Sequence, residues 1–109
     1  MKNFIKNGDL MTFTTPIGGV KSGVPLVLAA LFIIPTTDAI AGDECEGATV
    51  GVFELPKATA DVAEQFAAAY WDGSTVTTVE TDNKKIGVFI ESYANGTDLA
   101  GVRLDGVSV

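Results

Sequence analysis

Val24 to Pro35 reads VPLVLAALFIIP, and this apolar run decides how the rest of the chain can fold. The run has twelve residues, well short of the roughly 20 that a helix needs to cross a bilayer. Pro25 interrupts it near its start and Pro35 ends it, which suits two buried strands joined by a bend around Ala29 and Ala30. The run therefore predicts interior β-sheet and no membrane span.

The same run leaves one alternative open, the apolar core of a secretory signal. Lys2, Lys6 and Lys21 precede it, and Ala39-Ile40-Ala41 offers a cleavage site of the small-x-small kind. The 23 residues ahead of the run, however, include Asp9 and a strand-like apolar segment, which a leader rarely has. We favour the buried strands and keep an exported small binding domain, cleaved after Ala41, as the alternative.

The N-terminal side of the run divides into an arm and a first strand. Residues 1–7 are mixed and unpatterned, and they predict an N-terminal arm. Residues 10–14 predict a strand, and a second strand is expected to begin near Val20, after a loop rich in Pro and Gly. A chain of 109 residues is too small for two separate cores, so residues 8–109 predict a single β-rich domain.

On the C-terminal side, short β-branched stretches alternate with turn signals. Residues 46–55 predict a strand that Pro56 closes. Asp72-Gly73 predicts a turn before a strand over residues 75–79. Further strands are predicted over the remaining apolar stretches, residues 86–90 and 102–104.

Ala58 to Ala69 is the one stretch with a helical pattern. Thr59 can cap its N-terminus, and Val62, Phe66 and Ala69 recur at the spacing of one helical face. The sequence therefore predicts a mainly β protein, a small compact barrel or sandwich with one short helix and an extended N-terminal arm.

Charge and composition narrow the classes of function. Fourteen acidic side chains against seven basic ones give a net charge of −7, which would repel a nucleic-acid backbone. The chain has no His and a single Cys, Cys45, so it lacks the side chains that most often act as general bases or soft metal ligands. We predict no enzymatic activity, no cofactor and no nucleic-acid partner.

Two motifs could suggest ligand binding, and neither has the required spacing. In Gly18-Gly19-Val20-Lys21-Ser22, a Val stands where a phosphate-binding loop needs Gly directly before its Lys. Asp38, Asp43, Glu44 and Glu46 form an acidic cluster without the spacing of a calcium loop, so we predict no metal site.

Three aromatic residues are candidates for the core or for an oligomer interface. Tyr70 and Trp71 are adjacent, so in a strand they face opposite sides, and one can join the core while the other lies at an interface. Phe53 lies in a predicted strand and is the third candidate.

The order of short motifs along the chain resembles the small capsid cement (decoration) proteins of tailed phages. The motifs are Asn7-Gly8-Asp9, Pro16 with Gly19-Val20 and Ser22-Gly23, Gly51-Val52-Phe53-Glu54-Leu55-Pro56-Lys57, Tyr70-Trp71-Asp72, Ile86-Gly87-Val88 and Val102-Arg103-Leu104. They span nearly the whole chain, and the third and fourth are the most specific pair.

The resemblance implies a structural virion protein that binds the outer surface of the assembled phage head and cements neighbouring major capsid protein subunits. It implies a location on the capsid surface after synthesis in the host cytoplasm. In the arm, Phe4 and Ile5 are candidate capsid anchors, and Lys2 and Lys6 are candidate charge partners. Small all-β domains protect their sheet edges by self-association, so we also expect a homo-oligomer, dimer or trimer.

Overall fold

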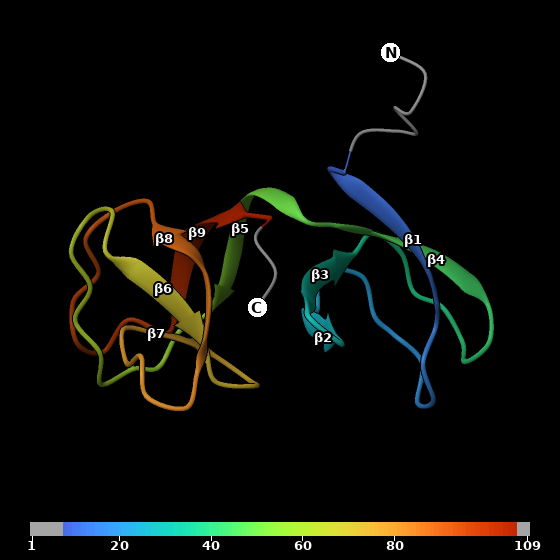
Figure 1. The fold of residues 1–109 in the computed structure, drawn as a ribbon. Coiled ribbons are helices and arrows are strands. Elements are labelled where there is room, and N and C mark those ends of the chain that lie inside the picture. Colours follow the sequence, from blue (N-terminus) through green and yellow to red (C-terminus); the bar gives the residue numbers. More distant parts are fainter. Residues whose placement is uncertain (1–7, 107–109) are drawn as a thin grey trace, which may run out of the picture.

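Antiparallel strands dominate the computed structural model, which describes residues 8–106 (Figure 1). The described residues form nine strands: β1 (Leu10–Thr14), β2 (Leu26–Leu28), β3 (Leu31–Pro35), β4 (Glu44–Ala48), β5 (Val50–Pro56), β6 (Ala68–Trp71), β7 (Val76–Thr77), β8 (Lys84–Phe89) and β9 (Leu99–Asp105). They make two sheets, with strand orders β1-β4-β3-β2 and β5-β9-β8-β6-β7. The mainly β class predicted from the sequence is confirmed.

The apolar run forms β2 and β3, which pair as a hairpin. Leu26 lies opposite Ile33 and Leu28 lies opposite Leu31, so the two strands are joined by a two-residue bend that begins at Ala29. From Phe32 to its end, β3 is buried, whereas β2 is half-buried at the edge of the sheet. The prediction that this run forms two strands joined by a bend is confirmed.

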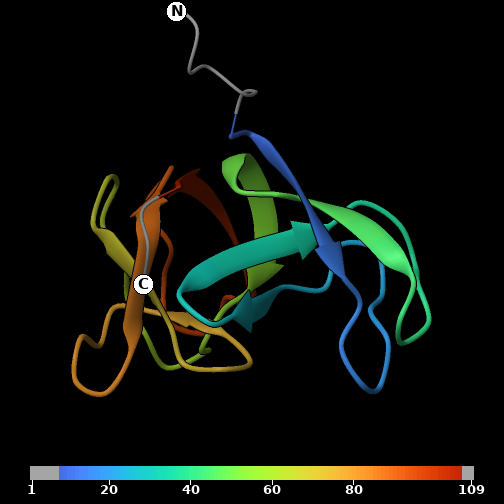
Figure 2. The same cartoon turned by 45° about the vertical axis from the view of Figure 1, so that its right-hand side comes forward.

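A single residue, Thr49, connects the two sheets. It lies between β4 and β5, where the sequence predicts one continuous strand, and it is buried. Its backbone N–H donates to the carbonyl of Asp9 at 2.9 Å, and its hydroxyl donates to the carbonyl of Gly8. The segment ahead of β1 therefore holds the bend in place, and the chain passes from one sheet to the other there (Figures 1 and 2).

The five-stranded sheet is curved into a half-barrel. Its longest pairing joins β5 and β9, from Val50 opposite Asp105 to Pro56 opposite Leu99. A parallel bridge between Lys57 and Val76 brings the two edges of the sheet together at one end. The curvature agrees in part with the compact barrel or sandwich expected from the sequence.

One close approach in this sheet requires glycine. Gly87 in β8 lies so near β9 that a Cβ atom there would be 1.9 Å from the carbonyl oxygen of Arg103. Any other residue at position 87 would push the two central strands of the sheet apart.

The main core lies where β3 packs against the half-barrel. Phe32 and Trp71 meet edge to face, with ring centroids 5.3 Å apart and planes at 67°. The other buried side chains of the cluster come from both sheets: Ile34, Leu55, Ala63, Ala69, Val76, Ile86, Phe89, Ala100, Val102 and Leu104. The hairpin that the apolar run forms is thus a structural part of the core.

The helix predicted over residues 58–69 is wrong. The segment runs as turns up to β6, and Phe66 has a φ of +66°, outside the right-handed helical region. Lys57 is 2% exposed, its ammonium donates to the carbonyls of Ala58 and Asp61, and the Asp61 N–H donates to the Ala58 carbonyl at 3.1 Å, which closes a single tight turn in place of a helical turn. The spacing of Val62 and Phe66 that suggested a helical face is therefore fortuitous.

The predicted arm, residues 1–7, lies outside the described residues. Within residues 8–106, no helix has the length and apolar character required to span a membrane.

Candidate docking surfaces

Two loops of the first sheet pair with each other beyond its strands. We call residues 15–25, between β1 and β2, and residues 36–43, between β3 and β4, the paired loops. Val20 and Ala39 exchange two backbone hydrogen bonds, of 2.9 and 3.1 Å. The strand expected to begin near Val20 is this single bridge, and the loops form a joined extension of the sheet.

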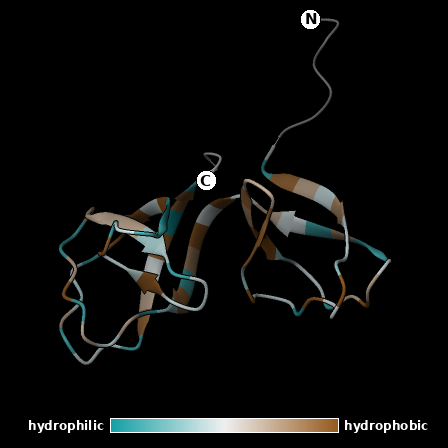
Figure 3. Cartoon of the chain, turned by 60° about the horizontal axis from the view of Figure 1, so that its bottom comes forward, coloured by the Kyte–Doolittle hydropathy of each residue, from teal (hydrophilic) through white to brown (hydrophobic). Residues whose placement is uncertain are grey.

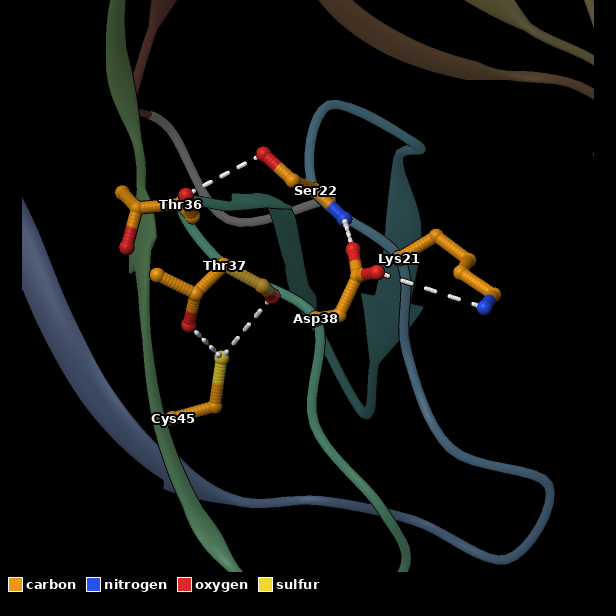
Figure 4. Close-up of polar contacts among 6 residues, drawn as sticks. All are labelled: Lys21, Ser22, Thr36, Thr37, Asp38 and Cys45. Carbon is orange, nitrogen blue, oxygen red and sulfur yellow. Dashed lines mark hydrogen bonds and ion pairs between the residues drawn. The ribbon is translucent and has the colours of Figure 1, made fainter.

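Side-chain contacts fix the two loops to each other (Figure 4). The carboxylate of Asp38 accepts a hydrogen bond of 2.7 Å from the backbone N–H of Ser22, and the hydroxyl of Ser22 donates to the carbonyl of Thr36 at 3.1 Å. Asp38 also lies 4.0 Å from the ammonium of Lys21, an exposed pair that adds little stability. The hydrogen bonds made by Asp38 and Ser22 therefore contribute more than the ion pair to holding the two loops together.

The glycine-rich stretch at residues 18–22 belongs to this pairing. Gly19 has a φ of +75°, and a Cβ atom there would lie 2.9 Å from the carbonyl oxygen of Ala39. The strand β2 follows the loop, where a phosphate-binding loop would lead into a helix. Gly19 therefore allows the two loops to pack closely, because it has no Cβ atom to clash with Ala39.

Two isoleucines are exposed on the paired loops. Ile17 is 99% exposed and Ile40 is 71% exposed. Ile17 lies in a turn closed by a hydrogen bond of 3.1 Å from the N–H of Gly19 to the carbonyl of Pro16, and a Cβ atom at Gly19 would be 3.8 Å from the Cα of Ile40. An open groove of about 650 Å³ is lined by both loops, with Ile40 among its lining residues. Exposed apolar groups gathered at a groove are typical of a docking surface.

A second apolar surface lies on the segment that was expected to be a helix. We call residues 58–67 the strap. Ala63 exchanges backbone hydrogen bonds of 2.9 and 2.8 Å with Tyr93, and Phe66 donates its N–H to the carbonyl of Phe89 at 2.9 Å. Val62 and Phe66 are 63% and 67% exposed. The strap is thus held against the half-barrel while two large apolar side chains face outward.

The paired loops and the strap lie at opposite ends of the molecule. In Figures 1 and 2 the paired loops extend from the first sheet on the right, and the strap, in yellow-green, lies on the far left beyond β6. Figure 3 shows that hydrophobic stretches occur in the loops at both ends as well as in the strands. Together with the exposure of Ile17 and Ile40 at one end and of Val62 and Phe66 at the other, this gives the molecule exposed apolar side chains at each end.

The three aromatic candidates have different surroundings. Trp71 is 7% exposed and belongs to the core, whereas Tyr70, on the other side of β6, is half-buried. Phe53 is half-buried and packs against the core. The candidates of the predicted arm lie outside the described residues: Lys2, Phe4, Ile5 and Lys6.

The sequence patterns did not indicate that the apolar residues of the two ends are exposed, although Val62 and Phe66 stood out by their helical spacing. Ile17 stands between Pro16 and Gly18, and Ile40 stands two residues before Gly42. A large apolar residue inside a turn-rich stretch has no strand or helix to bury it, and that signal was available. No group of three or more His, Cys, Asp or Glu side chains that could hold a metal lies within residues 8–106.

A comparison with known families shows to which family this chain belongs. A family model described as phage cement protein matches residues 5–104. The chain belongs to the phage cement protein family. No curated protein and no solved structure gives a significant match. The resemblance to cement proteins seen in the sequence motifs is thus confirmed over nearly the whole chain.

Membership of a cement protein family indicates a structural role in the phage particle and association with the capsid. A structural role of this kind argues against enzymatic activity. Exposed apolar side chains gathered on a surface are typical of contacts between proteins.

Proposed function

We propose that this cement protein binds the outer surface of the assembled head and holds neighbouring major capsid protein subunits together. The family match over residues 5–104 carries the proposal. The described structure supports it, because apolar side chains are exposed at two opposite ends of a framework of paired strands.

The two ends give a physical reason for cementing. A small domain attached to two neighbours must be released from both before either subunit can leave, so the second contact acts at a high effective concentration. A protein that binds the assembled lattice and not separated subunits also stabilises the lattice by mass action. Each large apolar side chain buried at a contact contributes about 1.5 to 3 kcal/mol, so a few side chains at each end suffice.

The direct test is binding to heads prepared without this protein. Purified protein is mixed with expanded heads and, as the matched control, with dissociated major capsid protein, and bound protein is measured after sedimentation. We expect saturable binding to heads, weak binding to free subunits and a higher temperature of head disruption. Protein that stays in the supernatant at all concentrations would contradict the proposal.

The arm and self-association extend the proposal. We propose that Phe4 and Ile5 anchor residues 1–7 on the capsid with Lys2 and Lys6 as charge partners. Deleting residues 1–7 should leave the melting temperature unchanged and lower the occupancy on heads; equal occupancy would contradict a role for the arm.

We also propose a dimer or trimer, which analytical ultracentrifugation of the free protein tests.

A further inference from the structure

The paired loops combine their two exposed isoleucines with an excess of negative charge. Residues 8–48 contain five acidic side chains, Asp9, Asp38, Asp43, Glu44 and Glu46, against one basic side chain, Lys21. The count of one minus five gives a net charge of −4 for this part of the chain. Within the paired loops themselves, Asp38 and Asp43 stand against Lys21, so one minus two gives a net charge of −1, and Glu44 follows at the start of β4.

Part of this charge lies at the groove itself. Asp38 and Asp43 both line the groove together with Ile40, and Glu44 follows Asp43 at the exposed start of β4. Lys21 lines the groove as well, but it lies 4.0 Å from Asp38, so its charge is already opposed within the loops. The carboxylates of Asp43 and Glu44 therefore make the charge of this surface negative.

We propose that the paired loops insert Ile17 and Ile40 into an apolar pocket of the major capsid protein that is bordered by Lys and Arg side chains. The isoleucines supply the affinity, since apolar burial dominates association. The carboxylates select a basic rim and speed the encounter, because complementary charge gives specificity and on-rate. The inference rests on the proposed function. It adds which end of the molecule makes one of the capsid contacts and which side chains that contact joins.

The exposure of the isoleucines allows a clean test. Ile17 has almost no contact with the rest of the described residues at 99% exposure, so replacing it removes nothing from the core. We choose I17S and I40S, singly and together, and V79S as the matched control, because Val79 is exposed (49%) but lies in the other sheet's loops. Melting temperatures should stay equal across the set.

Binding of each variant to expanded heads then decides between the outcomes. We expect each isoleucine substitution to weaken binding by about tenfold or more, and V79S to bind as the parent protein does. If the parent protein does not bind heads, the proposed function fails. If the parent binds and the I17S/I40S variant binds equally well, the proposed function stands and the insertion of the paired loops is overturned.

The charge of the rim needs a second pair of variants. D43N and E44Q remove charge without changing side-chain size, and the expected result is weaker binding at low salt together with a shallower salt dependence. Binding that strengthens on neutralisation, or that has the same salt dependence, would overturn the basic rim.

A second copy of the chain is the other possible occupant of the paired loops. Sedimentation velocity of the I17S/I40S variant without heads separates the two cases. An unchanged oligomeric state supports capsid docking, and loss of self-association would assign the paired loops to an interface between copies and overturn the proposal.

Discussion

Single residues carry strain and hydrogen bonding that the sequence pattern does not reveal. Ala29 opens the two-residue bend between β2 and β3 with a φ of +53°, a conformation that glycine adopts without cost. Positive φ at the first of the two bend residues is the arrangement of a type II′ hairpin, whose preferred residue there is glycine. The hairpin at the core is thus built with a residue that is not the best for its turn.

We expect Ala29→Gly to raise the free energy of unfolding by roughly 0.5 to 1 kcal/mol, because relief of left-handed strain exceeds the extra entropy of glycine in the unfolded chain. Denaturation by urea measures the difference. Ala30→Gly is the matched control and should lower the stability, since Ala30 has no positive φ to relieve. Equal effects of the two substitutions would contradict the turn assignment.

Lys57 is a second residue whose role depends on burial. Its ammonium donates to the carbonyls of Ala58, Asp61 and Thr97, so it ties β5 to the strap and to the segment ahead of β9. A charge at 2% exposure is stable only when it is so bonded.

Lys57→Met keeps the apolar stem and removes the donors. We expect a loss of about 2 to 3 kcal/mol, because three hydrogen bonds from a charged donor to part-buried carbonyls are removed. Exposed Lys84→Met should change stability by less than about 0.5 kcal/mol. Chemical denaturation of both variants checks this, and a loss at Lys57 no larger than at Lys84 would show that the ammonium does not hold the strap.

At the scale of elements, the turn between β6 and β7 is organised by a carboxylate. Burial raises the pKa of Asp72, but hydrogen bonds from the backbone N–H groups and hydroxyls of Ser74 and Thr75 outweigh it, and the pKa is lowered from 3.8. These bonds include 2.9 Å from the Ser74 N–H and 2.7 Å from the Thr75 N–H. The turn predicted at Asp72-Gly73 is confirmed, and its stability is linked to the ionised carboxylate.

The pH dependence follows from the direction of this shift. Because the pKa of Asp72 is lower in the folded state, its contribution is present above the unfolded value of 3.8 and is lost as pH falls below it. Asp72→Asn keeps one acceptor oxygen but cannot titrate, so the variant should lose less stability than the parent between neutral and acidic pH. Parallel pH profiles in urea would contradict the linkage.

Local patterns predicted some elements and missed others for identifiable reasons. The hairpin of β2 and β3, the first strand over residues 10–14 and the turn at Asp72 follow from apolar runs bounded by Pro, Gly and Asp. The break at Thr49 could not be predicted, because it depends on hydrogen bonds to a segment about 40 residues away. The sequence of the strap predicts a helix. The strap is not helical because of the burial of Lys57, which results from tertiary packing and is not visible in the local sequence.

The candidate surfaces show the same limit. The motif order resembles that of cement proteins, and the family match confirms this resemblance. The sequence patterns did not predict which residues face outward, since Val62 and Phe66 were expected only to share one face of a helix and are exposed outside any helix. Exposure depends on how the paired loops and the strap are held, and those contacts join positions far apart in sequence.

At the scale of the whole molecule, the two sheets depend on one core. Phe32 and Ile34 of β3 pack with residues of the half-barrel, so cleavage after Ala41 would remove β1, β2 and β3 together with these contacts. The exported alternative therefore requires residues 42–109 to fold without one side of their core.

We expect a fragment of residues 42–109 to show no cooperative unfolding, whereas a chain lacking only residues 1–7 should unfold cooperatively. Circular dichroism during heating compares the two. A cooperative transition in the shorter fragment would favour the exported domain.

The bend at Thr49 also has a mechanical consequence. The strands β4 and β5 run as one covalent line from the paired-loop side of the molecule to the strap, which begins just after Pro56. If internal pressure in the head pulls the two ends apart, tension passes along the covalent backbone of this line, so the hydrogen bonds between β5 and β9 need not break for the load to be carried. A tether loaded in this way fails first where it is attached, at its contacts with the shell.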